Sequence, residues 1–143
     1  MLACEFKLND QYGKTYNIKY PQEKICVLVF ADRASVSQVE KWVRALYESY
    51  QDKIFIYGVA QLKGVPRWLQ STIRGIFKKF VKFSVMMDWS GEVCRAYGYK
   101  GGKAYVVIVN RNGVIQHTFN GRASEDLIQE CRRIIDHLKP VLL

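Results

Sequence analysis

The chain has 143 residues, 49% of them apolar and 24% charged, so it can build a hydrophobic core and fold as one domain over residues 1–143. Every apolar run falls short of the ~20 residues that span a bilayer, which excludes an integral membrane protein. The 22 basic and 13 acidic residues give a net charge of +9, which favours acidic partners.

The four cysteines, Cys4, Cys26, Cys94 and Cys131, are far apart in the sequence, and no C-x-x-C motif is present. This spacing predicts neither a zinc ribbon nor a dithiol redox motif, and it favours free thiols in a reducing, cytoplasmic compartment. Residues 1–4 resemble the end of a lipoprotein cleavage site, so an exported or periplasmic protein stays open as an alternative. The two histidines lack metal-ligand spacing and no P-loop is present, so no metal or cofactor is predicted.

The N-terminal third predicts strands followed by a helix. Residues 6–8 and 15–20 alternate apolar and polar side chains and predict a β-hairpin that ends at Pro21. The continuous apolar run 25–31 is typical of a central strand covered on both faces. Helical periodicity over 36–51 follows, opened by a capping box of Ser35 with Gln38 or Ser37 with Glu40.

The rest of the chain predicts alternating strands and helices. A buried strand over 54–60 completes a parallel strand–helix–strand unit. The elements expected after it are a helix over 66–81 with Pro66 in its first turn, strands at 83–87, 104–109 and 114–119, a short helix after Ser90, and a last helix from Ser124 that ends at Pro140. The pattern predicts an α/β sandwich with a mixed sheet.

That order of elements, with residues 6–10, 88–93 and 107–113, resembles the thioredoxin superfamily in its redoxin or peroxiredoxin-like branch. Residues 33–35 after an apolar strand are also similar to the YtfJ-like bacterial proteins of that superfamily. The resemblance covers nearly the whole chain. It implies a thioredoxin-like three-layer sandwich, with a mixed central sheet flanked by helices and an N-terminal β-hairpin.

The resemblance also locates the redox site, and both of its hallmarks are missing. The C-x-x-C positions at the start of the first helix are held by Ala34, Ser35, Val36 and Ser37, and the cis-proline position by Ala104. A serine cannot form a disulfide, and a cis bond before a non-proline residue costs ~2.5–4 kcal/mol, so Ala104 is expected to be trans. We therefore expect a redox-inactive binding or scaffolding module.

Two groups of residues are candidate binding sites. Asp32, Arg33, Ser35 and Ser37, with Ala104 opposite, are expected to form a polar ledge at a helix N-terminus for an anionic or peptide ligand. The second group lies on the helix over 66–82, in a stretch without acidic residues between Asp52 and Asp88. Its apolar face is expected to dock on the sheet, and its solvent face carries the basic residues Arg67, Arg74, Lys78 and Lys82.

This basic face is either an ordinary solvated surface or the contact for an acidic protein or peptide. An anionic lipid surface is a further alternative, disfavoured because the core is expected to need the apolar face. Nucleic acid is disfavoured because no binding motif accompanies the charge. A homodimer formed through a sheet edge or aromatic patch also stays open.

The alternative function is that of a thiol-dependent oxidoreductase or peroxidase that uses a single cysteine. Cys94 is the candidate, because a first-turn position and the neighbouring Arg95 both favour a thiolate. Cys26 and Cys131 are expected to be inert core thiols, and Cys4 an exposed one.

Overall fold

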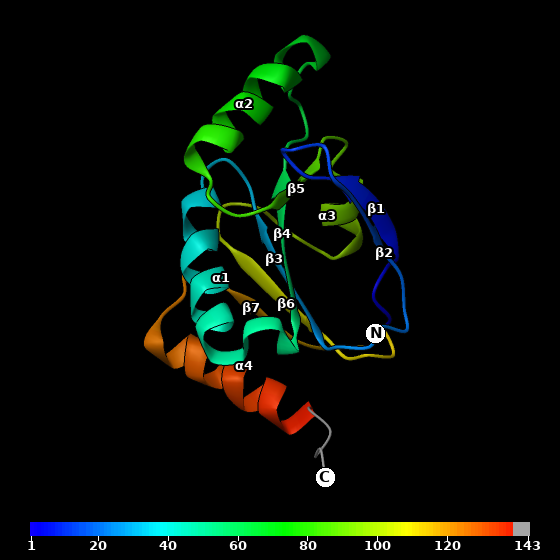
Figure 1. Ribbon diagram of the computed structural model, residues 1–143, viewed down its shortest axis with the longest axis vertical. Helices are drawn as coiled ribbons and strands as arrows, with labels where there is room; N and C mark the ends of the chain where they lie inside the picture. The colour runs from blue at the N-terminus through cyan, green and yellow to red at the C-terminus, as the bar shows by residue number, and fades with distance from the viewer. Residues whose placement is uncertain (139–143) are drawn as a thin grey trace.

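The computed structural model describes residues 1–138, and the predicted end of the last helix at Pro140 lies outside them. Figure 1 shows a central sheet with helices to one side and a β-hairpin on the other. The elements in chain order are β1 (Phe6–Asn9), β2 (Thr15–Ile18), β3 (Cys26–Ala31), α1 (Val36–Tyr50), β4 (Phe55–Gln61), α2 (Gln70–Phe80), β5 (Val85–Asp88), α3 (Glu92–Ala96), β6 (Tyr105–Val109), β7 (Ile115–Asn120) and α4 (Glu125–Leu138). This order confirms the predicted one.

Strand β3 is the middle strand of the sheet because its sequence is apolar on both faces. All six of its residues are buried. It pairs in parallel with β4 and antiparallel with β6, which gives the order β5-β4-β3-β6-β7 and confirms a mixed sheet. The hairpin β1–β2 forms a separate two-stranded sheet.

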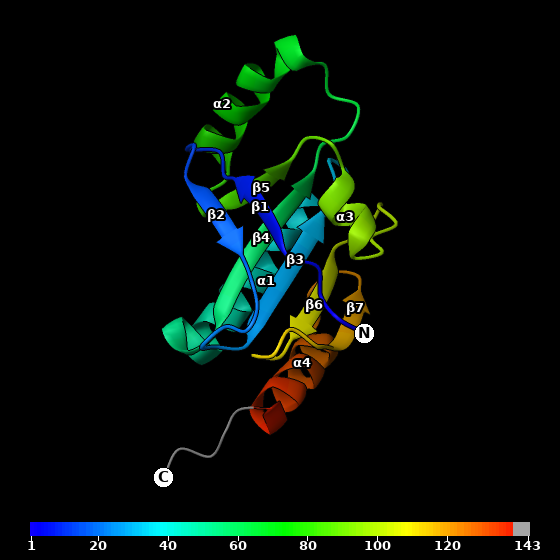
Figure 2. The same cartoon turned by 90° about the vertical axis from the view of Figure 1, so that its right-hand side faces the viewer.

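The two faces of the sheet are covered by different elements (Figures 1 and 2). Helices α1 and α4 cover one face, where Trp42 and Ile135 are fully buried against β3 residues such as Val27. The hairpin and α3 cover the other, where Leu28 and Phe30 pack with Tyr97. The thioredoxin-like three-layer sandwich is therefore confirmed.

Helix α2 departs from the expected packing. It lies at one end of the molecule, beyond the ends of the strands (Figure 1), and Phe77 is its one buried residue. Ile76 and Phe80, expected to dock on the sheet, are 47% and 69% exposed. The reason is that the core beneath α2 is small, since the edge strand β5 has only four residues. Phe77 and the half-buried Ile73 are enough to cover it.

The predicted capping boxes of α1 are wrong. The Ser35 hydroxyl bonds to Asp32 rather than to the helix amides, and the Gln38 side chain accepts a hydrogen bond from the main-chain amide of Ala104 at 3.0 Å. Ser37 likewise makes no side-chain cap. The α4 cap is confirmed in part, because Ser124 Oγ accepts a hydrogen bond from the amide of Leu127 at 3.2 Å.

Candidate functional site

The turn that leads into α1 is held by the carboxylate of Asp32. Asp32 Oδ1 accepts hydrogen bonds of 3.1 Å from the amides of Ala34 and Ser35 and one of 2.9 Å from Ser35 Oγ. Its Oδ2 accepts a 2.7 Å bond from the amide of Gly102, in the loop before β6. Asp32 thus holds the turn before α1 and places a negative charge in front of the helix N-terminus, where it opposes the approach of an anionic ligand.

The charge of Asp32 is stabilised where it stands. Partial burial acts to raise the pKa of this carboxyl, but the hydrogen bonds from Gly102, Ser35 and Ala34 outweigh it and lower the pKa below its ordinary value. The other members of the predicted ledge are divided: Arg33 and Ser37 are exposed, whereas Ser35 is fully buried. The ledge open to a ligand consists of Asp32, Arg33 and Ser37, and ligand binding there stays a prediction.

The position of the missing cis-proline is also closed by internal bonds. Ala104 is fully buried, and within residues 1–138 the cis peptide bond is Tyr20–Pro21, so the expected trans bond at Ala104 is confirmed. Its amide donates to Gln38 Oε1, and its carbonyl accepts a 2.8 Å bond from the amide of Gly121. The main-chain groups of Ala104 are thus paired within the chain instead of facing a peptide.

Three of the four thiols are buried. Cys94, in α3, is 1% exposed; burial raises the pKa of its thiol, and the neighbouring Asp88 carboxylate raises it further. Burial also raises the pKa of Cys26 above its ordinary value and that of Cys131 to about 12. Cys4 is exposed, as expected. The environment of Cys94 is therefore the opposite of one that favours a thiolate.

A groove of about 650 Å³ lies between α2 and the turn of the hairpin. It brings together two predicted partner residues, Arg74 and Lys78, with Lys7 of β1. The Arg74 guanidinium lies 5.9 Å from the ring centre of Trp89, and Tyr12, at the tip of the turn, is 57% exposed. Arg67 and Lys82 are exposed but lie outside the lining of this hairpin–α2 groove.

The hairpin wall of the groove is held by a buried polar network. Asp10 accepts hydrogen bonds from the amides of Tyr12 and Lys14, each at 2.9 Å, and from Ser84 Oγ at 2.7 Å. The fully buried Gln11 side chain donates to the Phe83 carbonyl at 2.7 Å and accepts from the Val85 amide at 2.8 Å. The Asp10 carboxylate is thus hydrogen-bonded to donors within the chain. The three cations of the lining outnumber it, so the groove keeps a net positive charge.

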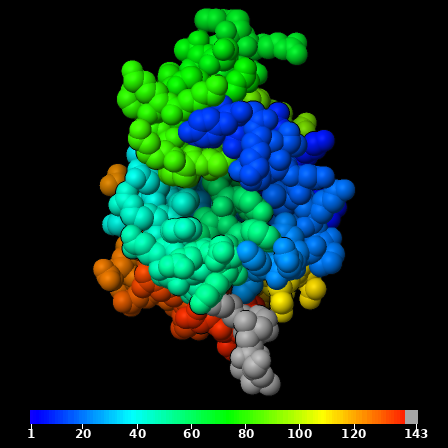
Figure 3. All heavy atoms as spheres, in the orientation of Figure 1, coloured from blue at the N-terminus to red at the C-terminus, as the bar shows by residue number. Residues whose placement is uncertain are grey.

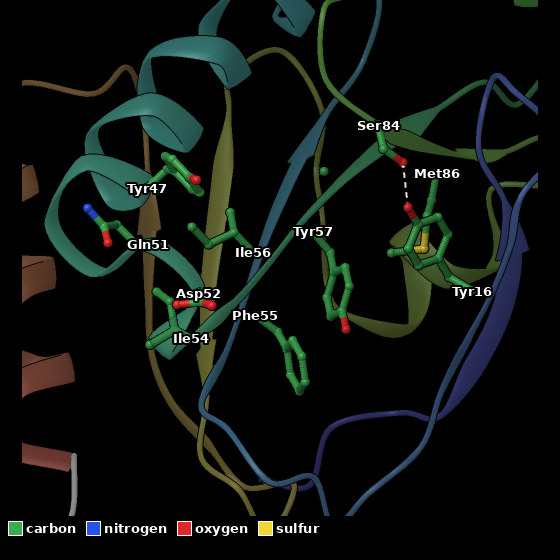
Figure 4. A pocket seen from close by; sticks show the side chains of 11 residues that line it. Tyr16, Tyr47, Gln51, Asp52, Ile54, Phe55, Ile56, Tyr57, Ser84 and Met86 are labelled. Carbon is green, nitrogen blue, oxygen red and sulfur yellow. Dashed lines mark hydrogen bonds between the residues drawn. The ribbon is translucent and has the colours of Figure 1, made fainter.

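A second, more apolar hollow of about 290 Å³ follows the outer edge of β4. Strand β5 pairs only with residues 58–61 of β4, so residues 55–57 have no strand on that side within the described chain. Figure 4 shows Phe55 and Tyr57 directed to one side and Ile56 to the other, and Figure 3 shows β4 at the surface between α1 and the hairpin. A homodimer formed through a sheet edge or aromatic patch would use this open edge and its aromatic lining. The homodimer stays a prediction.

The sequence matches the AhpC/TSA family over residues 2–118. The chain belongs to this family. No curated protein sequence matches the chain significantly.

Solved structures similar to this AhpC/TSA-family chain share its fold at low sequence identity. They include the exposed lipoprotein thioredoxin Etrx1 of Streptococcus pneumoniae strain TIGR4, with a TM-score of 0.71, 17% identity and coverage of 92% of this chain and 99% of that one. The thiol-disulfide oxidoreductase of Bacteroides fragilis NCTC 9343 has a TM-score of 0.66, 17% identity and coverage of 94% and 99%. A thio-disulfide isomerase of Thermus thermophilus has a TM-score of 0.64, 19% identity and coverage of 94% of both chains. These likenesses establish the thioredoxin fold.

The described residues of this AhpC/TSA-family chain contain neither a metal-ligand cluster nor a helix that could cross a membrane. Within residues 1–138, no three histidine, cysteine, aspartate or glutamate side chains are grouped so that they could hold a metal ion. Over the same span, each helix is too short or too polar to cross a bilayer. The site residues that sequence reasoning missed are Lys7 and Tyr12, because nothing in their own segment signals that the hairpin turn lies beside α2.

Proposed function

We propose that this protein is a redox-inactive thioredoxin-fold binding module for an acidic peptide or an acidic segment of a protein. The observation that carries the proposal is the state of the former redox position. Ala34 and Ser37 stand where the redox thiols would be, and the carboxylate of Asp32 is bonded to the turn just before the helix. Such a site has no thiol nucleophile, and a carboxylate beside it would destabilise a thiolate rather than stabilise it.

The hairpin–α2 groove is the proposed binding site. Lys7, Arg74 and Lys78 supply three cations, and the one carboxylate in the lining, that of Asp10, is held by internal hydrogen bonds. Trp89 and Tyr12 add aromatic surface beside these cations. An extended segment that carries glutamate or aspartate with an interspersed aromatic residue is complementary to this lining.

The alternative function is that of a single-cysteine enzyme acting through Cys94. The burial of its thiol beside Asp88 opposes that role, since nucleophilic attack requires an accessible thiolate. Neither function decides between a cytoplasmic and an exported protein, so the compartment stays a prediction.

The test is binding of a fluorescein-labelled peptide of glutamate and phenylalanine residues, measured by fluorescence anisotropy. Binding is expected to weaken at least about tenfold in the double variant Arg74→Glu, Lys78→Glu and to fall as salt is raised. The matched control is Lys41→Glu, Lys53→Glu, which changes the net charge equally at exposed positions outside the groove. Equal binding by the two double variants would show that net charge, not the groove, attracts the peptide.

A further inference from the structure

Helix α2 exposes apolar side chains that the core does not use. Trp68, in the 3-10 turn that precedes the helix, is 80% exposed, Phe80 is 69% exposed and Ile76 is 47% exposed. Ile76 and Phe80 are four residues apart and share one flank of the helix, away from the buried Phe77. We call Trp68, Ile76 and Phe80 the α2 apolar patch.

The segment that carries this patch is rich in cations and has no acidic residue. No aspartate or glutamate occurs between Asp52 and Asp88. The ammonium group of Lys79 lies 5.5 Å from the ring centre of Phe80. The other exposed cations of the segment are Lys53, Lys63, Arg67, Lys82 and Lys78, which also lines the hairpin–α2 groove. An anionic surface that contacts α2 therefore meets cations, and no carboxylate, from this segment.

The shape of this end of the molecule favours a surface over a ligand pocket. Figures 1 and 3 show α2 forming a projecting end of the molecule. A projecting helix needs no concave partner to bury its side chains when the partner is a bilayer. Tryptophan and phenylalanine, with lysines that reach back to the headgroups, are the side chains that amphipathic helices place at the membrane interface.

We infer that α2 docks this protein on anionic lipid bilayers, with Trp68, Ile76 and Phe80 inserted at the headgroup boundary and the neighbouring lysines and arginines against the phosphates. This membrane contact goes beyond the proposed binding of an acidic peptide. It uses the outer surface of α2, whereas the peptide groove lies between α2 and the hairpin turn. The reason given against a lipid contact from the sequence, that the core needs the apolar face, does not hold for these three residues.

The experiment is co-sedimentation of the full chain with vesicles of phosphatidylcholine alone and of phosphatidylcholine mixed equally with phosphatidylglycerol. We expect binding to the mixed vesicles that weakens as salt is raised, because the contact is partly electrostatic. The triple variant Trp68→Ser, Ile76→Ser, Phe80→Ser is expected to lower the partition coefficient at least about tenfold. Its far-ultraviolet circular dichroism should match that of the wild type, because all three side chains are exposed.

A matched control and a spectroscopic readout locate the contact. The control variant Leu2→Ser, Tyr47→Ser removes two exposed hydrophobic side chains outside both α2 and the hairpin–α2 groove, and it is expected to bind as the wild type does. Trp42 is fully buried and Trp89 is half-buried, so insertion of Trp68 should shift the emission to shorter wavelength. That shift should disappear in Trp68→Phe, which keeps an apolar side chain.

Three results would overturn the inference. One is a lack of binding to the mixed vesicles at low salt. The second is equal binding by the α2 triple variant and the wild type, which would reduce the contact to charge alone. The third is a dimer, seen by light scattering without lipid, that the same triple variant dissociates, because the patch would then bind a second copy of the chain.

Discussion

The Asp32 carboxylate and the Gly102 amide are joined by a 2.7 Å hydrogen bond across 70 residues of sequence. The same carboxylate binds the amides of Ala34 and Ser35, so one side chain ties the turn before α1 to the loop before β6. In the thioredoxin superfamily these two segments carry the dithiol and the cis-proline that faces it. Here the Asp32 carboxylate joins the two segments by a hydrogen bond.

The first prediction concerns the Asp32 carboxylate. Asp32→Ala is expected to lower the free energy of unfolding by about 1–2 kcal/mol at neutral pH, because the amides of Ala34, Ser35 and Gly102 lose their charged acceptor. The pKa of Asp32 is lowered by folding, so its contribution is present above the unfolded-state pKa of about 3.9 and is lost as the pH falls through the lower folded-state pKa. Urea unfolding should therefore show a difference in the free energy of unfolding between the variant and the wild type at neutral pH, and this difference should disappear in acid.

The matching control is Asp32→Asn, which retains an acceptor oxygen but no charge. It is expected to recover part of the stability at neutral pH and to lack the contribution that depends on ionisation. A gap between Asp32→Ala and the wild type that stays constant through the acid range would contradict the assigned role of the charge.

The second prediction concerns thiol reactivity. In the folded protein at neutral pH, alkylation followed by mass spectrometry is expected to modify Cys4 readily and to leave Cys26, Cys94 and Cys131 protected. Burial keeps reagent from these three, and the raised pKa of each keeps it in the thiol form until the pH is well above neutral. All four should react in denaturant.

The Cys4→Ser variant provides the check, because the folded protein should then have no fast-reacting thiol. If Cys94 reacted faster than Cys4 in the native protein, and peroxide blocked that reaction, the single-cysteine enzyme would replace the binding module as the proposed function.

The fold was predictable because its signals are local. The apolar run 25–31 and the periodicity of 36–51 specify a central strand and the helix that covers it, and both are confirmed. The packing of α2 was not predictable in the same way. Apolar residues at helical spacing show that a helix has an apolar face, but not how much core lies beneath it, and here the short β5 leaves Ile76 and Phe80 uncovered.

For the position of the missing thiols, the sequence predicted the location but not the contacts that surround it. The place of the missing thiols followed from the strand that precedes them, but their surroundings depend on partners distant in sequence. Local spacing favoured Gln38 as part of a capping box, whereas its actual partner is Ala104, 66 residues away. Lys7 was missed for the same reason. It lines the groove because the hairpin folds beside α2, and no pattern in the sequence near Lys7 indicates this.

The third prediction uses two glycines to test whether α2 is free in solution. A Cβ atom added at Gly75, within α2, meets no other atom within 4 Å, so Gly75→Ala should raise the free energy of unfolding by about 0.5–1 kcal/mol. The same change at Gly113 should lower it by more than about 1 kcal/mol, because φ there is +84° and the new Cβ would lie 2.8 Å from Tyr20 Cβ. Thermal and urea unfolding of the two variants measure both effects. If Gly75→Ala destabilised the protein instead, α2 would be packed against something at that position, and the free outer surface required for membrane docking would not exist.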